Sequence, residues 1–266
     1  RGVRAGPLPL TEPRPHVLAL FVIIPGVLYF VGLGFPGASQ TPDRGALGSG
    51  GLLISRDSGE NWAKADTPEN KRDKVPTKIL DVYFHPVNSN TIYLGTKSSG
   101  LWKSVNSGDT WQRVTDKAGI LKPNSDVYKV SVSRQNPKVV YLAIYQDGRG
   151  RVLRSVDSGE SFTEIYFVNT KGYGVFDLYA SGYNADTAYI TTGQGGFLET
   201  VNGGKTWRVK KWFGEPLTRL VVNPSSENEM YLVTSSYLIF KTTDAGETWT
   251  DVSTKIAGDL QATYQS

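Results

Sequence analysis

Four charged residues recur at one position of a repeated β-type segment, and carboxylates in such an arrangement could perform acid–base chemistry. These residues are Asp81, Lys129, Asp177 and Arg219. Each stands before an apolar residue of its segment, in order Val82, Val130, Leu178 and Leu220. Because side chains alternate along a strand, one column would pack between repeats while the other faces a central channel. Asp81 and Asp177, two repeats apart, would then form a pair of carboxylates. One could act as the general acid and the other as the general base.

The alternation of acids and bases also permits a structural interpretation, which we favour. Opposite charges on neighbouring repeats would offset one another in a belt of ion pairs, and such networks are common outside catalytic sites. The two histidines, His16 and His85, share no neighbourhood that resembles a metal site, and neither has an evident serine partner. We therefore predict no metal, no cofactor and no catalytic residue, and we treat the charged column as part of a binding face.

Aromatic residues that do not recur form a second set of candidates. A tyrosine occurs once per repeat in a strand-like run, and this regularity predicts core packing; the residues are Tyr93, Tyr141, Tyr189 and Tyr231. Aromatic residues in the connections are different, because packing does not demand them there and a ligand could contact them. The candidates for a ligand-binding or partner-binding face, with one arginine from a nearby connection, are Tyr173, Trp212, Phe213 and Arg149.

An eight-residue box, SVNSGDTW in its second copy, explains how these residues are positioned. Five copies occur, and their glycines lie 42 to 51 residues apart. The Asp or Asn side chain closes a tight turn, the glycine supplies a positive φ, and the aromatic residue anchors the next strand. We therefore predict a structural role for the box. Its key residues are Asp57, Gly59 and Trp62; Asn106, Gly108 and Trp111; Asp157, Gly159 and Phe162; Asn202, Gly204 and Trp207; and Asp244, Gly246 and Trp249.

Runs rich in Val, Ile, Tyr and Thr flank each box and predict four antiparallel strands per repeat. Four such strands make one blade of a β-propeller. We therefore predict an all-β propeller over residues 51–266, with blade units at 51–66, 79–115, 127–166, 175–210 and 217–252. The first unit has only two strands, so we expect about four and a half blades of a larger propeller.

Propeller geometry assigns the connections to two faces. With strands named A to D outward from the axis, the A–B and C–D turns share one face, and the D–A and B–C connections share the other. Ligands in propellers usually bind on the second face and in the axial channel. We therefore expect a protein or a glycan to bind on the D–A and B–C face.

The box resembles the BNR or Asp-box repeat of β-propellers, which occurs in sialidases, sortilin-type receptors, some plant-polysaccharide hydrolases and propellers similar to the photosystem II stability and assembly factor. Resemblance to a sialidase implies an Arg-Ile-Pro motif, which the sequence lacks. Resemblance to the polysaccharide hydrolases implies two aspartates in an aromatic-lined groove between two tandem propellers, of which the sequence shows one. Resemblance to the assembly factor implies a non-enzymatic scaffold. We expect a non-catalytic scaffold, with a sialidase-like or xyloglucanase-like glycoside hydrolase as the alternative.

The N-terminal region contains an uncharged apolar run of 19 residues at 17–35, close to the length that spans a bilayer. Arg1, Arg4 and Arg14 precede it, and the positive-inside rule then places the propeller across the membrane from a cytoplasmic tail. We predict a tail at 1–16, a transmembrane helix at 17–35, a Gly/Pro/Ser linker at 36–50 and an extracytoplasmic propeller. The alternative is a signal peptide cleaved near Ser39, which would give a secreted protein.

Composition adds two limits. The chain has no cysteine and therefore no disulfides, which argues against the disulfide-rich sortilin-type receptors. It has 29 basic and 25 acidic residues, and we find no dense basic stripe of the kind that nucleic-acid-binding proteins carry. We therefore predict no nucleic-acid partner.

Overall fold

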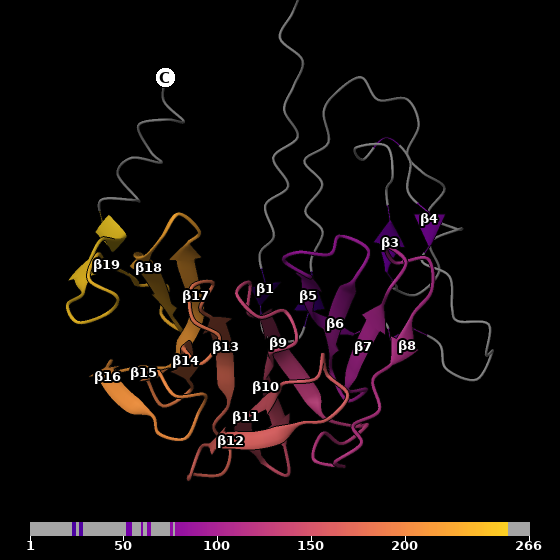
Figure 1. Ribbon diagram of the computed structural model, residues 1–266. Coiled ribbons are helices and arrows are strands. Elements are labelled where there is room, and N and C mark those ends of the chain that lie inside the picture. Colours follow the sequence, from indigo (N-terminus) through magenta and orange to yellow (C-terminus); the bar gives the residue numbers. More distant parts are fainter. Residues whose placement is uncertain are drawn as a thin grey trace, which may run out of the picture. The chain divides into compact units, whose positions relative to one another are not determined.

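The computed structural model describes residues 78–254 without interruption, together with residues 23–24, 27–28, 52–54, 60, 63–64 and 75–76. The chain divides into two compact units, Arg1–Leu47 and Gly48–Ser266. Four complete blades lie in the second unit and follow one another in chain order (Figure 1).

Each blade is a four-stranded antiparallel sheet whose strands pair in chain order. The first blade contains β5 (Ile79–Phe84), β6 (Ile92–Thr96), β7 (Leu101–Ser104) and β8 (Gln112–Arg113). The second contains β9 (Asp126–Val132), β10 (Val140–Gln146), β11 (Arg149–Ser155) and β12 (Thr163–Phe167). The third contains β13 (Val175–Ala180), β14 (Ala188–Thr192), β15 (Gly196–Thr200) and β16 (Arg208–Trp212). The fourth contains β17 (Leu217–Asn223), β18 (Ser226–Thr234), β19 (Ile239–Thr242) and β20 (Thr250–Asp251).

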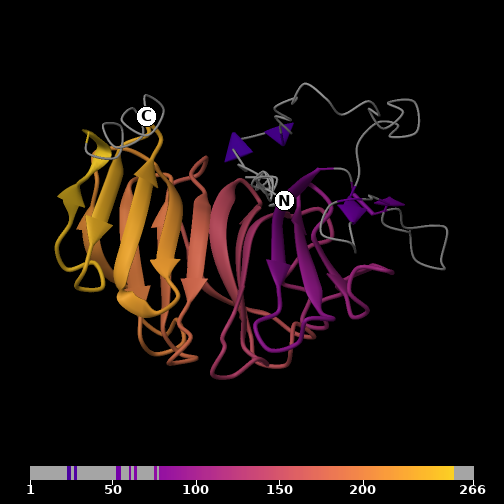
Figure 2. The same ribbon diagram turned by 90° about the horizontal axis from the view of Figure 1, so that it is seen from above.

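The inner strands hold neighbouring blades together. Strand β5 contacts β9, β9 contacts β13, and β13 contacts β17, while the outer strands fan away from these contacts (Figures 1 and 2). The predicted propeller arrangement of four-stranded blades is confirmed. Two further short strands, β3 (Leu53–Ile54) and β4 (Ala63–Lys64), pair within the first predicted unit.

The core lies between the blades, as the alternating pattern predicts. Val130, Leu178 and Leu220 of the apolar column are buried, whereas Val82 is 44% exposed. The recurrent tyrosines Tyr93, Tyr141 and Tyr189 are buried as well, and Tyr231 is half-buried. Burial of such large side chains is the main source of stability in a sheet protein without disulfides.

The box forms the same hydrogen-bonded turn in each of the four complete blades. In the second copy, the Asn106 side-chain oxygen accepts a hydrogen bond from the Thr110 backbone N–H at 2.9 Å. The Ser104 hydroxyl accepts one from the Gly108 backbone N–H at 2.8 Å. The bonds of Ser155, Thr200 and Thr242 to their box glycines repeat this contact.

Two consecutive residues of each turn adopt a positive φ, and only the second was predicted to do so. Gly108 has a φ of 89° and Ser107 before it has a φ of 57°. Serine or alanine in this left-handed region costs free energy, so the turn must supply contacts that offset it. One such contact is the backbone N–H of Ser107, which donates to the carbonyl of Asn90 in the A–B turn at 2.8 Å.

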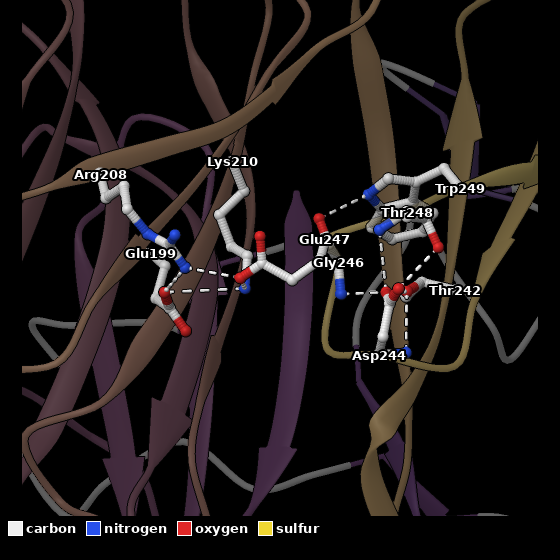
Figure 3. Close-up of polar contacts among 9 residues, drawn as sticks. All are labelled: Glu199, Arg208, Lys210, Thr242, Asp244, Gly246, Glu247, Thr248 and Trp249. Carbon is white, nitrogen blue, oxygen red and sulfur yellow. Dashed lines mark hydrogen bonds and ion pairs between the residues drawn. The ribbon is translucent and has the colours of Figure 1, made fainter.

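Figure 3 shows how the last box also braces the preceding blade. Asp244 accepts hydrogen bonds from the Thr248 backbone and hydroxyl groups at 2.9 and 2.6 Å. Glu247 in the same turn forms ion pairs with Arg208 at 2.8 Å and with Lys210 at 2.9 Å, both from β16. The side chain of Lys210 is only 2% exposed, so this contact compensates a cation that is removed from water.

The aromatic residues of the box differ in how far they are buried. Trp111 and Phe162 are 1% and 2% exposed, which confirms the predicted burial. Trp207 and Trp249 are half-buried. The indole N–H of Trp111 donates to the carbonyl of Gly108 at 3.0 Å, whereas that of Trp207 donates to Ile165 in the preceding blade. The first copy, with Asp57, Gly59 and Trp62, lies outside the described residues.

The transmembrane helix predicted at 17–35 is not supported. The described residues of this run are two short strands, β1 (Ile23–Ile24) and β2 (Val27–Leu28), which pair antiparallel. Pro25 stands between them in the sequence, and proline lacks the N–H that a helix interior requires. Across the described ranges, no helix is long and apolar enough to cross a membrane. The predicted tail at 1–16, the linker at 36–50 and the cleavage site near Ser39 lie outside the described residues.

Candidate functional site

The antiparallel strand order gives the propeller a turn face and a loop face. On the turn face, the C–D turn bonds to the A–B turn of its own blade; for example, Ser158 N–H donates to the Lys138 carbonyl at 2.9 Å. On the loop face, the B–C connection bonds to the D–A connection that follows; for example, Gly150 N–H donates to the Tyr173 carbonyl at 2.8 Å. All candidate aromatic residues of the sequence lie on or next to the loop face.

The charged column forms the predicted belt of ion pairs. The Lys129 ammonium lies 3.2 Å from Asp81 Oδ1 and 3.8 Å from Asp177 Oδ1. The Arg219 guanidinium lies 3.8 Å from Asp177 Oδ2. Four inner strands are therefore connected by three ion pairs.

Both carboxylates of the belt also bind the backbone of the next blade. Asp81 Oδ2 accepts a hydrogen bond from the Val130 N–H at 2.9 Å. Asp177 Oδ2 accepts one from the Leu220 N–H at 3.0 Å. Burial raises the pKa of the Asp177 carboxyl, and the Lys129 charge and the Leu220 N–H oppose this rise. Each aspartate thus braces its own blade against the following one.

This geometry favours a structural role for the aspartate pair. Since both carboxylates contact one ammonium, their nearest oxygens are no more than about 7 Å apart, a limit that includes separations found between the two carboxyl groups of glycosidases. However, the Asp177 side chain is only 2% exposed, and Lys129 occupies the space between the carboxylates. A general acid must reach the substrate within hydrogen-bonding distance. We therefore interpret the belt as a brace between blades.

A bulge at the loop-face end of every inner strand was not foreseen from the sequence. The pairing register shifts at the same point in all four blades and leaves one residue of each inner strand without a partner. Such bulges re-aim side chains and are frequent beside functional sites. The unpaired residues are Leu80, Tyr128, Phe176 and Thr218. Tyr128 and Phe176 meet edge to face, with ring centroids 5.6 Å apart.

The second blade carries a group of exposed candidates on the loop face. Arg149 lies over the ring of Phe167, 5.4 Å from its centroid. The Tyr173 side chain is 42% exposed and Phe167 is 43% exposed. Gly150 is bonded to both ends of the D–A connection that follows β12, since its carbonyl accepts the Val168 N–H and its own N–H donates to the Tyr173 carbonyl. A Cβ at Gly150 would lie 2.4 Å from the Val175 nitrogen, so only glycine permits this close approach.

The two candidates of the third blade differ. Trp212 is 55% exposed at the end of β16, where it is available to a ligand. Phe213 is only 9% exposed and packs against Phe240 and Trp249, with ring centroids 5.0 and 5.8 Å away. The expectation that Phe213 faces a ligand is therefore wrong, because the core of the fourth blade takes up its ring. Tyr237, which is 77% exposed with a φ of 64°, was missed although it too is an unrepeated aromatic residue.

Comparison with known proteins supports a β-propeller family. A family model described as sortilin, neurotensin receptor 3 matches residues 50–148. The xyloglucanase Xgh74A of Acetivibrio thermocellus is 25% identical over 245 residues, which cover 76% of this chain and 29% of that protein. Other curated xyloglucanases match at 23% to 28% identity. The chain spans less than a third of the length of each.

Solved structures show the same fold. An ancestral GH74 enzyme superposes with a TM-score of 0.58 at 20% identity, over 76% of this chain and 28% of that one. YCF48 from Cyanidioschyzon merolae superposes with a TM-score of 0.51 at 15% identity, over 65% of this chain and 55% of that one.

The relatives correct one expectation. The prediction that the protein is not an enzyme is contradicted, because the curated proteins that resemble it are named as xyloglucanases. The missing Arg-Ile-Pro motif argued against a sialidase only, and one fold can carry several activities. The chain is a β-propeller, and curated proteins that resemble it are named as xyloglucanases.

Proposed function

We propose that the chain is part of a glycoside hydrolase that acts on a xyloglucan-type β-glucan, and that its loop face binds the glucan. The observation that carries this proposal is the similarity to a named xyloglucanase across 76% of the chain. The match extends over most of the propeller, so it concerns the whole fold and not only the repeated box.

The loop face offers chemistry that suits a glucan. A pyranose ring has apolar C–H faces and a rim of hydroxyl groups, so flat aromatic side chains with neighbouring polar groups are good partners for it. Tyr173 and Trp212 expose about half of their surface there, and the Tyr128–Phe176 pair stands at the bulges of the inner strands. Arg149 adds a hydrogen-bond donor beside Phe167.

The test is a comparison of binding and hydrolysis with the full chain. Soluble xyloglucan would be the substrate, and dextran the unrelated neutral polymer. We expect the chain to bind xyloglucan and not dextran. Tyr173→Ala and Trp212→Ala should each weaken binding by about fivefold or more, since an aromatic contact at a binding site contributes over 1 kcal/mol.

Phe84→Ala is the matched control. Phe84 is 64% exposed but ends the inner strand β5 on the turn face. Its replacement should leave xyloglucan binding unchanged. The proposal fails if xyloglucan is neither bound nor cleaved, or if Phe84→Ala weakens binding as much as the loop-face variants do.

A further inference from the structure

A cavity of 180 Å³ opens at the turn-face end of the inner strands, at the opposite end from the aromatic residues of the loop face. All four complete blades contribute to its lining. The residues that matter for the argument are Tyr83, Arg134, Tyr179, Tyr183, Pro224 and Glu227. Water occupies about 30 Å³ per molecule in the liquid, so the cavity could hold roughly six waters or one sugar ring.

The carboxylate of Glu227 is already used in building the wall. Its Oε1 accepts hydrogen bonds from the Tyr179 hydroxyl at 2.9 Å and from the Gly182 N–H at 2.6 Å. Its Oε2 accepts one from the Ser181 hydroxyl at 2.6 Å. These bonds fix the fourth blade to the third and direct the negative charge into the protein.

Arg134 supplies the positive charge of the cavity. It is exposed, and among the described residues it has neither a hydrogen bond nor an ion pair. A guanidinium group presents a planar fork of donors that matches the two oxygens of a carboxylate. The cavity thus combines a donor fork for an anion with a carboxylate whose two oxygens already accept hydrogen bonds from the wall.

The tyrosines and prolines give the rest of the cavity a mixed character. Tyr83 donates its hydroxyl hydrogen to the Val132 carbonyl at 3.2 Å, which leaves its oxygen lone pairs as acceptors. Tyr183 is 65% exposed at the rim. Ring faces and the Pro224 ring can contact C–H groups, while the phenolic oxygens can accept hydrogen bonds from hydroxyl groups.

We propose that this cavity binds a single uronic acid residue, either free or at the end of a glycan. The carboxylate pairs with Arg134, the hydroxyl groups of the sugar donate to the tyrosine oxygens, and its C–H face lies against the rings of Tyr183 and Pro224. The site is separate from the loop face in position and in ligand charge.

The experiment measures binding of glucuronate, galacturonate and glucose to the full chain by ligand-observed NMR titration. We expect both uronates to bind more tightly than glucose. Arg134→Gln should weaken uronate binding at least tenfold, and Arg134→Lys should restore part of it because the charge returns without the fork. Tyr183→Ala should weaken binding by a smaller factor.

Lys138→Gln is the matched control, since Lys138 is an exposed cation four residues further along the same A–B turn and does not line the cavity. It should leave the affinity for uronates unchanged. A melting curve of each variant shows that it is folded. The proposal is overturned if glucose binds as tightly as the uronates, if no uronate binds, or if Arg134→Gln has the effect of Lys138→Gln.

The result is independent of the proposed loop-face function. Tyr173→Ala should reduce xyloglucan binding and leave uronate binding unchanged, whereas Arg134→Gln should do the reverse. A loss of uronate binding in Tyr173→Ala would contradict a separate cavity site.

Discussion

The turn face and the loop face of the same four blades differ in how regularly their contacts repeat from blade to blade. On the turn face, each box repeats one set of hydrogen bonds, from the box glycine to the hydroxyl residue and from the fourth box residue to a carbonyl at the A–B end of the blade. On the loop face, the connections differ in length, sequence and contacts from blade to blade. Repetition marks the positions that every blade needs in order to fold, and irregularity marks the positions that folding leaves open to a ligand.

The largest contrast is expected between two tryptophans. Trp111 on the turn face is 1% exposed, and Trp212 on the loop face is 55% exposed. Trp111→Ala should lower the free energy of unfolding by about 3–5 kcal/mol, because it leaves a large cavity in the core. Trp212→Ala should change it by no more than about 0.5 kcal/mol. Urea unfolding of both variants checks this, and equal losses would mean that the two faces do not differ in the way we describe.

The next contrast uses two glycines that share a positive φ. Gly204 in the third box has a φ of 88°, and a Cβ there would lie 2.5 Å from Ile165. Gly148 on the loop face has a φ of 78°, and a Cβ added to it would meet no atom within 4 Å. Gly148→Ala should cost about 1–2 kcal/mol from backbone strain alone. Gly204→Ala should cost about 1–3 kcal/mol more from overpacking, so a smaller loss of unfolding free energy in Gly204→Ala would contradict the contact.

Acid should lower the stability that the box aspartates give to the turn face. The exposed aromatic residues of the loop face carry no carboxylate, so acid has no such effect on them. The Ser155 hydroxyl and the Ser161 N–H lower the pKa of Asp157 to about 2, and similar bonds from Thr242 and Thr248 lower the pKa of Asp244. A carboxylate with a depressed pKa in the folded state stabilises the fold above its unfolded pKa of about 4, and this contribution is lost as the pH falls toward 2. The double variant Asp157→Asn with Asp244→Asn should lose less stability between pH 5 and pH 2.5 than the wild type. An identical pH dependence of the urea midpoint would refute the assignment.

The smallest effect is expected from an exchange within the box. Asn106 accepts a hydrogen bond from the Thr110 N–H and donates one to the Thr110 hydroxyl at 3.0 Å. In the last box, Asp244 instead accepts from the Thr248 hydroxyl. Because a hydroxyl can donate or accept, Asn106→Asp should change stability at neutral pH by no more than about 0.5 kcal/mol. Differential scanning calorimetry at pH 7 checks it, and Asn106→Ala serves as the variant that should melt at a lower temperature.

Much of the fold could be predicted from the sequence because its signals are local. The box needs only eight consecutive residues to close its turn, and the apolar column marks buried positions in three of the four inner strands, at Val130, Leu178 and Leu220. These patterns gave the strands, the blades and the ion-pair belt. The expected helix at 17–35 is not supported, since the described residues of that run pair as two short strands and Pro25 between them disfavours a helix interior.

The sequence by itself determined the repeating unit, since hydrogen bonds within a turn and the alternation of side chains along a strand are fixed by neighbouring residues. Only the tertiary structure decided which unrepeated residues are available. Phe213 packs into the core against the fourth blade and is not available to a ligand. Bulges bring Tyr128 and Phe176 together. Residues of four blades line the cavity at Arg134. Such contacts join residues that are far apart in the sequence, and no local pattern specifies them because they depend on how each blade packs against the next.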